Sequence, residues 1–535
     1  MSIKYKILKG IDLAGLNFLR PVILLCYREE PEEQVRQIAL HILVPILAFT
    51  LFLFLWSILA PLHKTRSGEV PTPAVVWDSA KQVWQFHTRQ SEQLEAYEAT
   101  GAQREQMLQQ ARERLAEIQP LEAEARRQLK QADATMAEYL ETEVQPLQAE
   151  YESLRYQFRD QQNARKAELE KLAATLTPED RSARDTFLKQ YHAHELQIES
   201  EKETLRALKS KQDAVRAKVF PERIEALRAQ SAIAEEKQFL LKLVDTLENN
   251  KAQKLAEEQA QYETQLEAFY TADGEKLPQL AKSLLFTEAR IQNTATSSYA
   301  KPMTLPDQVL RSIACVFAGF VIASVIAIPI GIVCGLSRVV MSALTPFIAL
   351  FKPVSPIVWL PILFIIVGGF IPDPDQHWLI SALAKAPLIG WMKINPAFIA
   401  SALTVAMCSL WPTLVNTAFG VASIDRDHLN VARVLRLGFW SRLFKIVIPS
   451  ALPLTFAGLR ISLGVGWMVL IAAELLSSSE GVGKFVWDMF NNGSSQTFAQ
   501  MFVVVFVVGI IGFMLDRIMI IFQRLVSFDE NAPSL

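Results

Sequence analysis

Long apolar runs and one long polar stretch alternate along this chain. The apolar runs cover about residues 38–60, 309–336, 339–370, 398–419, 449–476 and 498–522. A helix needs about 20 apolar residues to cross a hydrocarbon core of about 30 Å, because its backbone polar groups must be satisfied internally. The pattern therefore predicts an all-α, polytopic membrane protein with about six transmembrane helices. Prolines interrupt the run 339–370, and we expect its second half to provide the third span.

The first apolar run, residues 38–60, has two interpretations, a cleaved signal peptide or an uncleaved span. It is longer than the usual apolar segment of a signal peptide, and 37 more polar residues precede it. We therefore favour an uncleaved transmembrane helix.

The polar stretch, residues 81–300, is dense in Glu, Gln, Lys, Arg and Ala. Apolar residues recur in it at steps of four and three, the spacing of an inter-helix seam: Leu140, Val144, Leu147, Tyr151, Leu154 and Phe158. Residues 177–180, Thr-Pro-Glu-Asp, suit the start of a return helix. We predict a long helical hairpin or coiled coil, although Pro120, Pro146 and Pro221 leave open a folded-back bundle of shorter helices. A spacer, a docking arm and an oligomerisation element are all compatible with this insert.

Composition excludes some classes of function. The chain is 50% hydrophobic and 21% charged, with a net charge of -2, so no nucleic-acid partner is expected. The four cysteines lack the spacing of metal ligands, so neither a metal site nor a disulfide framework is predicted.

Lysines and arginines in the short loops predict the orientation of the spans. They cluster before the first span and between the fourth and fifth spans: Lys4, Lys6, Lys9, Arg20, Arg28 and Arg36, then Arg426, Arg433, Arg436, Arg442 and Lys445. With six spans, both clusters and the C-terminal tail share one side, which we predict to be the cytoplasm of a bacterial cell. Both termini are then cytoplasmic, and the insert is periplasmic.

Residues 424–448, which join the fourth and fifth spans, form an amphipathic, basic segment. Val431, Val434, Leu435, Phe439 and Leu443 can form an apolar stripe beside its arginines. Pro449 is predicted to end this segment and to start the next span. Such a helix can lie in a groove of a cytoplasmic protein or on the membrane surface.

This segment resembles the loop by which permeases of binding-protein-dependent ABC importers dock on their ATPase. The usual pattern of that loop is Glu-Ala-Ala, three residues, Gly, nine residues and Ile-x-Leu-Pro. Here the triplet is Asn430-Val431-Ala432, Arg436 stands at the glycine position, and Ile446-Val447-Ile448-Pro449 closes the pattern. Ala432, Trp440 and Pro449 keep the register of the pattern. Its Glu, its first Ala and its Gly are replaced in this chain. The coupling-loop residues that the resemblance implies are Asn430, Val431, Ala432, Leu435, Arg436, Gly438, Trp440 and Pro449.

Four other segments resemble the nitrate, sulfonate, taurine and bicarbonate branch of these permeases. They are 71–77 (PTPAVVW), 352–361 (KPVSPIVWLP), 458–464 (GLRISLG) and 472–474 (AAE). Residues 429–438, LNVARVLRLG, are most similar to the nitrate and nitrite permeases. The resemblance covers about residues 38–80 and 305–525, and the insert departs from it.

The resemblance implies the fold of a type I ABC importer permease that moves a small anion by alternating access. The substrate would be nitrate, nitrite, cyanate, bicarbonate, taurine or another small sulfonate. The implied partners are two cytoplasmic ABC ATPases, a second permease copy in a homodimer and a periplasmic substrate-binding protein, besides a possible periplasmic partner of the insert. ATP and Mg²⁺ would bind to the ATPases, so this chain is expected to hold no cofactor and to be no enzyme.

The predicted organisation has five parts. They are a cytoplasmic N-terminal segment (1–37), the first span with its entry segment (38–80), the periplasmic insert (81–300), a five-helix permease core with the coupling loop at 420–449 (301–525) and a cytoplasmic tail (526–535).

Charges inside the spans are candidates for function, because a charge in the hydrocarbon core is costly. Arg460 lies about eleven residues into the fifth span, where it can attract an anion, reach the cytoplasmic interface or pair with a neighbouring helix. Glu474 lies roughly 21 Å further along the same helix, so we expect a structural or gating role for it. Further candidates for the substrate pathway, with packing as the alternative, are Trp359, Trp411, Asn416 and Trp467.

No catalytic residue is predicted. Residues 478–485 superficially resemble a phosphate-binding loop, but Ser478 replaces its first glycine and Phe485 replaces the hydroxyl residue that contacts magnesium. The alternatives to an importer are a membrane-anchored coiled-coil scaffold without transport activity and a passive anion channel.

Overall fold

The computed structural model describes residues 11, 20–27, 30–65, 68–176, 181–374, 377–385, 394–425, 427–428, 430, 434–477 and 479–526. The chain divides into two compact units, Met1–Gln90 together with Lys301–Leu535, and Ser91–Ala300. We call them the membrane unit and the insert unit.

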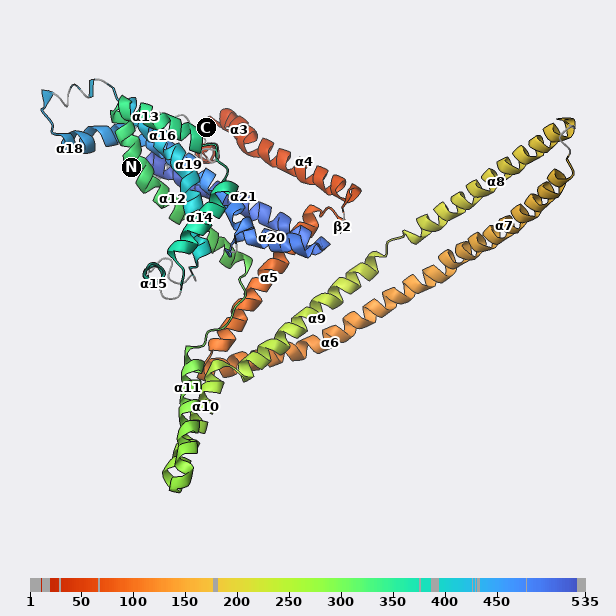
Figure 1. The fold of residues 1–535 in the computed structure, drawn as a ribbon, viewed down its shortest axis with the longest axis horizontal. Helices are drawn as coiled ribbons and strands as arrows, with labels where there is room; N and C mark the ends of the chain where they lie inside the picture. The colour runs from red at the N-terminus through yellow and green to blue at the C-terminus, as the bar shows by residue number, and fades with distance from the viewer. Residues whose placement is uncertain are drawn as a thin grey trace. The chain divides into compact units, whose positions relative to one another are not determined.

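Helices form most of the membrane unit (Figure 1). A short antiparallel pair of strands, β1 (Lys64–Thr65) and β2 (Gly68–Glu69), precedes α5. The helices are α2 (Arg20–Cys26), α3 (Pro31–Ile38), η2 (Ala39–Leu43), α4 (Val44–Leu59), η3 (Ala60–Leu62), α5 (Pro73–Glu98, which continues into the insert unit), α12 (Leu305–Leu336), α13 (Arg338–Phe351), α14 (Pro356–Phe370), α15 (Trp378–Ala384), α16 (Pro396–Ala422), α18 (Phe439–Arg442), η6 (Leu443–Val447), α19 (Ile448–Leu476), α20 (Val482–Asn492) and α21 (Ser495–Val526).

Five helical stretches of the described chain are long and apolar enough to span a membrane: Pro31–Leu62, Leu305–Leu336, Pro396–Ala422, Phe439–Leu476 and Gln496–Leu525. A sixth candidate is the pair α13 and α14, which is bent by 99°. The prediction of about six spans is therefore confirmed. The third differs from the expectation, because α14 alone has 15 residues and would reach only about 22 Å. The bent pair fits a broken span or a re-entrant loop.

Helices α12, α16 and α19 form the core of the membrane unit. Glycines let their backbones approach closely: a Cβ at Gly319 would lie 2.5 Å from the Ala402 carbonyl, and one at Gly331 would lie 2.8 Å from the Leu414 carbonyl. Small residues of this kind are the usual contact surface between membrane helices, where packing rather than the hydrophobic effect drives association. The three helices thus form one tightly packed group.

A hydroxyl group from α19 supports the backbone of α16 near Pro412. Ser462 Oγ accepts from the Thr413 N–H at 3.1 Å and donates to the Ser409 carbonyl at 2.5 Å. These two backbone groups would bond to each other in a regular helix. An inserted side chain of this kind satisfies backbone groups beside a proline in a membrane helix.

The prediction for Pro449 holds only in part. The element α19 begins at Ile448 with Pro449 in its first turn, as expected, but Pro449 does not end the helix before it, because the helical stretch runs without interruption from Phe439 to Leu476. The π turn η6 lies directly before this proline. Its altered hydrogen-bonding register accommodates the residue that lacks an N–H group.

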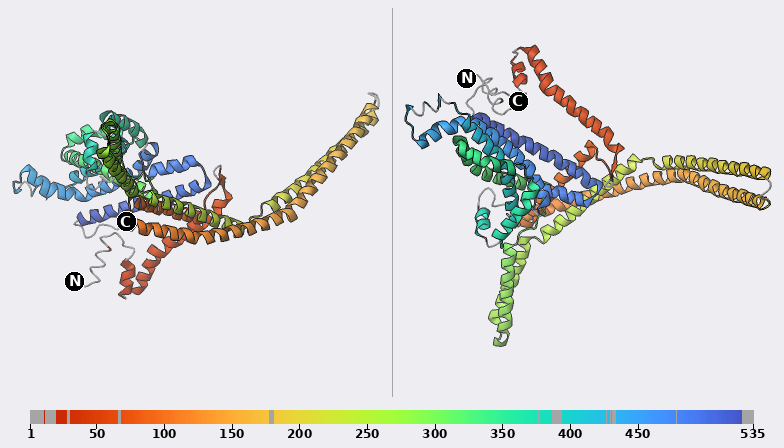
Figure 2. Two further views of the ribbon diagram at one scale, coloured as in Figure 1. Left: turned by 90° about the horizontal axis from the view of Figure 1, so that it is seen from below. Right: turned by 45° about the horizontal axis from the view of Figure 1, so that its top comes forward.

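The insert unit consists of two antiparallel helical hairpins (Figures 1 and 2). In the long hairpin, α6 packs against α9 and α7 against α8; in the short hairpin, α10 packs against α11. Their elements are α6 (Gly101–Tyr139), η4 (Leu140–Val144), α7 (Gln145–Ala174), α8 (Arg181–Arg216), α9 (Pro221–Glu248), α10 (Lys251–Thr271), η5 (Gly274–Lys276) and α11 (Leu277–Thr296). The predicted turn at 177–180 lies outside the described residues.

Three prolines have different effects on the long hairpin. Pro120 lies inside α6 without ending it, whereas Pro146 and Pro221 stand at the starts of α7 and α9. The π turn η4 lies beside the break between α8 and α9, where the Tyr139 hydroxyl donates to the Val215 carbonyl at 3.2 Å and its ring contacts Phe220. The insert is therefore neither one unbroken hairpin nor a compact bundle. Whether it packs as a true coiled coil stays a prediction.

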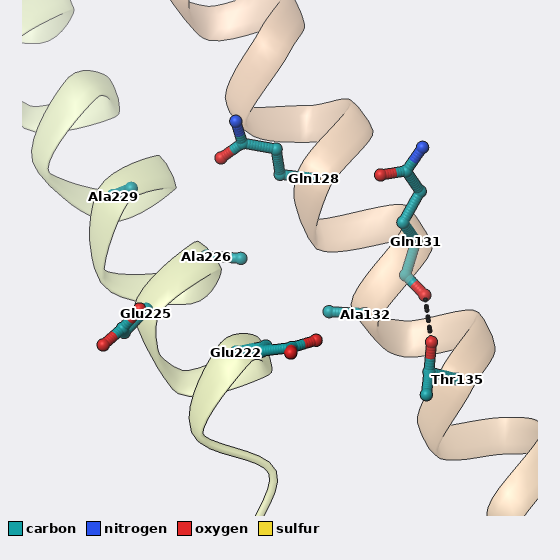
Figure 3. Close-up of a pocket in the computed structure, with 8 residues that line it drawn as sticks. All are labelled: Gln128, Gln131, Ala132, Thr135, Glu222, Glu225, Ala226 and Ala229. Carbon is teal, nitrogen blue, oxygen red and sulfur yellow. Dashed lines mark hydrogen bonds between the residues drawn. The ribbon is translucent and has the colours of Figure 1, made fainter.

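A polar groove separates α6 and α9 near this joint (Figure 3). Its volume is about 600 Å³, and its lining residues are Gln128, Gln131, Ala132, Thr135, Glu222, Glu225, Ala226 and Ala229. Three alanines stand where larger side chains would fill the seam. Further along the same pair of helices the seam is apolar and closed, with Ile118, Leu240 and Leu243 buried.

A buried polar layer interrupts the seam between α7 and α8. Glu201, 7% exposed, accepts from Arg165 at 2.5 Å and from Gln162 at 2.7 Å. Burial by itself would raise the pKa of Glu201, but the two hydrogen bonds and the arginine charge outweigh it, so the pKa lies below its usual value.

Acidification is expected to weaken the α7–α8 pair. Because the pKa of Glu201 is lower in the folded protein, its ionised form stabilises the fold at neutral pH, and this contribution is lost as the pH falls through the folded-state pKa. Hydrogen-exchange protection of the α8 amides should fall below about pH 4. Glu201→Gln should show a smaller fall, and Glu195→Gln, at an exposed position, should match the wild type. An equal fall in the wild type and Glu201→Gln would contradict the expectation.

Candidate functional site

The coupling-loop segment lies at one end of the core helices. Next to it, Val421 and Val447 pack together with Ala451. Val431 and Ala432 lie outside the described residues; Asn430 is exposed, and Gly438 is the N-cap of α18, where its carbonyl accepts from the Arg442 N–H at 2.9 Å. Pro449 lies in the first turn of α19.

Several large apolar side chains of this segment are exposed. Val434, Leu435, Phe439, Trp440 and Phe444 are each at least 60% exposed. The Trp440 ring stacks on Phe444 at 6.0 Å and meets the edge of Phe439 at 5.4 Å. We call these five residues the loop patch. Exposed, clustered aromatic residues are typical of protein-binding surfaces.

Arg436 adopts a backbone conformation that favours glycine. Its φ is 45°, in the left-handed region, and it stands where the docking-loop pattern has Gly. A side chain in this region costs roughly 1–2 kcal/mol per residue. The loop thus keeps its geometry with Arg436 in place of the glycine, at an energetic cost.

Arg436→Gly is therefore expected to stabilise the loop locally by about 1 kcal/mol, because glycine adopts a positive φ without steric cost. Hydrogen exchange of the amides in residues 437–447 measures this change. Arg442→Gly is the matched control: this arginine lies inside the continuous helical stretch Phe439–Leu476, so glycine should lower local stability there by about 1 kcal/mol. Faster exchange in Arg436→Gly would contradict the expectation.

At the other end of α19, a network around Glu474 joins α12, α19 and α20. Glu474 is 1% exposed, and its two carboxylate oxygens lie 2.7 and 2.8 Å from Ser312 Oγ. The Gly483 N–H donates to Glu474 Oε2 at 3.0 Å, and the Val482 N–H donates to Ser312 Oγ at 3.0 Å. A Cβ at Gly481 would overlap the carboxylate, so the turn closes directly on Glu474. These contacts hold three helices together around Glu474; its structural or gating role stays a prediction.

The segments that lead to and from the insert unit belong to this same end. Val76 of α5 and Leu305 of α12 pack in one cluster with Val482 of α20. His87 and Thr304 are joined by a hydrogen bond of 2.6 Å. The loop patch and the connections to the insert unit therefore lie at opposite ends of the core helices.

Arg460 pairs with the last span. Its Nε lies 2.6 Å from Asp516 Oδ1, and a terminal nitrogen lies 3.1 Å from Oδ2. This bidentate geometry, between α19 and α21, favours the alternative in which Arg460 holds a neighbouring helix. The sequence analysis missed Asp516, although an acidic residue within an apolar span is itself a signal.

Asp516→Asn is expected to lower the free energy of unfolding by about 2–3 kcal/mol, because Arg460 loses its counter-charge inside a spanning segment. The exchange Arg460→Asp with Asp516→Arg should restore most of this loss. Thermal unfolding in lipid nanodiscs measures both variants. Unchanged stability in Asp516→Asn would show that the pair contributes little.

The tryptophans and Asn416 have separate surroundings. Trp359 of α14 and Trp411 of α16 both contact Phe351 of α13, with ring centroids 5.8 and 6.3 Å apart. Trp467 is buried in the main core, and its N–H donates to the Val508 carbonyl at 3.1 Å. Asn416 donates to the Pro412 carbonyl at 2.8 Å. The structure thus brings Trp359 and Trp411 together and gives the other candidates different partners. Their proposed roles in the pathway stay predictions.

Known proteins resemble the membrane unit. The family described as the inner membrane component of binding-protein-dependent transport systems matches residues 327–528. The nitrate import permease NrtB of Synechococcus elongatus is 33% identical over 220 residues, which cover 41% of this chain and 69% of the relative. NrtB of Synechocystis sp. is 30% identical over 256 residues, covering 48% and 82%. The bicarbonate transport permease CmpB of Synechococcus elongatus is 34% identical over 218 residues, covering 41% and 68%.

Proposed function

The chain belongs to the inner-membrane permeases of binding-protein-dependent ABC transport systems, in the nitrate and bicarbonate branch, and we propose that it forms the membrane pathway of an importer for a small anion. The relatives named for nitrate and for bicarbonate support this substrate class. The predicted partners are two ATPases that bind ATP and Mg²⁺, a second permease copy and a substrate-binding protein.

The observation that carries the coupling proposal is the loop patch. Five large apolar side chains are exposed in the segment that matches the ATPase-docking pattern. Exposure of such an apolar surface to water is unfavourable unless a partner covers it. We infer that the partner is the ATPase and that the patch is cytoplasmic. Because the insert connections lie at the opposite end of the core helices, the insert is then periplasmic.

A single helix links this patch to the Glu474 network. Residues Phe439–Leu476 are continuous, and 38 residues span about 57 Å at 1.5 Å per residue. Closure of the ATPases on ATP would move the patch, and the tightly packed α12, α16 and α19 would move with it. Alternating access then requires that each nucleotide state favour a different arrangement of this group.

Reconstitution tests the proposal. The permease, its ATPase and its binding protein are placed in proteoliposomes, and ATP-dependent uptake of labelled nitrate and labelled bicarbonate is measured. Uptake that requires ATP and all three components supports the importer. An intact chain that purifies from membranes without ATPase activity would instead favour the scaffold, and uptake without ATP would favour a channel.

A further inference from the structure

Two indole N–H groups in the membrane unit lack an acceptor among the described residues. The indole nitrogens of Trp359 and Trp411 are covered by protein, and neither has a hydrogen-bond partner among the described residues. An indole N–H can only donate, and the hydrocarbon region offers no water to accept from it. Buried polar groups in proteins are nearly always paired, so each exception needs an explanation.

The two indoles belong to one aromatic group. Phe351, the last residue of α13, contacts Trp359 at 5.8 Å with an interplanar angle of 40° and stacks on Trp411 at 6.3 Å with an angle of 9°. Trp411 is 9% exposed, and its cluster is otherwise apolar, with Ala327, Ile348 and Leu414. The consecutive helices α13 and α14 and the later helix α16 thus place two indole donors in an apolar setting.

This group lies at the bend between α13 and α14. The two helices meet at 99°, and Trp359 lies in the first turn of α14. Lys352, directly after Phe351, is exposed and adds a positive charge. Broken membrane helices place irregular backbone where it borders a cavity, and the N-terminal end of a half-helix favours an anion.

The other buried tryptophan of the core provides a contrast. The N–H of Trp467 is bonded to the Val508 carbonyl. This indole, which packs in the main core, therefore has a backbone acceptor. Trp359 and Trp411 do not, although α13, α14 and α16 surround them with helical backbone.

We propose that the N–H groups of Trp359 and Trp411 bind the transported oxyanion as it passes the bend between α13 and α14; this inference rests on the proposed function. Nitrate and bicarbonate present several acceptor oxygens in one plane, and each indole N–H can donate to one of them as the anion passes. Neither nitrogen is open to solvent in the present arrangement. The anion therefore contacts them in a state in which α13 and α14 have moved away from α16.

Phenylalanine substitutions test this site, because they remove the N–H but keep the stacked ring. ATP-dependent uptake of labelled nitrate and bicarbonate is measured against concentration for Trp359→Phe, Trp411→Phe and the double variant in proteoliposomes. Each single variant is expected to raise KM on the order of tenfold, the loss that corresponds to one hydrogen bond to a charged group. The double variant should raise it further. Thermal unfolding and ATPase co-purification show whether each variant still folds and assembles.

Trp56→Phe is the matched control, because Trp56 stacks on Phe502 and Phe506 in a second aromatic group of the same unit. It should leave KM unchanged. An unchanged KM in folded Trp359→Phe and Trp411→Phe complexes overturns the site but leaves the importer in place. An equal rise in Trp56→Phe overturns it also, because the effect would then belong to packing. A wild-type complex that moves neither anion contradicts the proposed function itself.

Discussion

Trp440→Asp is expected to abolish stable association with the ATPase. Trp440 is the centre of the loop patch, since its ring contacts both Phe439 and Phe444 and is 67% exposed. Central aromatic residues dominate the binding energy of protein interfaces, and their loss typically costs 2 kcal/mol or more, roughly thirtyfold in affinity. A charge in the same place adds the cost of desolvation. Leu435→Asp should act in the same direction.

Affinity purification from membranes, with copurifying ATPase activity as the readout, measures this effect. Trp487→Asp is the matched control, because Trp487 is an exposed tryptophan on α20, at the opposite end of the core helices. It should retain the ATPase. If Trp440→Asp copurifies as much ATPase as the wild type, the loop patch does not dock the ATPase, and a membrane-surface position for it becomes the better explanation.

Gly483→Ala is expected to destabilise the membrane unit strongly. A Cβ at this position would lie 2.5 Å from the Ile471 carbonyl, 2.7 Å from Glu474 Cβ and 2.9 Å from the Leu475 nitrogen. Two of these neighbours are backbone atoms, so α20 must move away from α19. That movement also breaks the bond from the Gly483 N–H to Glu474, which leaves a buried carboxylate with one partner fewer. Overpacking and loss of this bond together are expected to cost about 3 kcal/mol or more.

Thermal unfolding of purified protein in nanodiscs measures the change, with membrane accumulation as a second readout. Gly464→Ala, on the neighbouring helix α19, is the control, because a Cβ there meets nothing within 4 Å. Its stability should be unchanged or higher by up to about 1 kcal/mol, the helix propensity difference between the two residues. Equal stability of Gly483→Ala and Gly464→Ala would show that α20 is not held closely by the Glu474 network.

Local properties of the chain were sufficient to predict the spans and the docking segment. A membrane-spanning helix depends on about 20 consecutive apolar residues, which can be counted in the sequence. The polar insert was predicted to be helical from the spacing of its apolar residues, and it is helical. The same approach was only partly right at Pro449 and at the third span, since the effect of a proline depends on the backbone around it. The π turn before Pro449 and the 99° bend before α14 leave no local signal beyond the prolines themselves.

The amino-acid sequence alone was thus enough to establish the number of spans, the helical insert and the family resemblance, because each depends on neighbouring residues. The tertiary structure decided which side chains contact one another. Arg460 meets Asp516 56 positions away, and Glu474 meets Ser312 162 positions away. Which side chains meet depends on how the helices are rotated and packed, and small residues such as Gly319 and Gly331 control that packing over distances that no local pattern records. For the same reason, only the folded chain brings Trp359 and Trp411 together around Phe351.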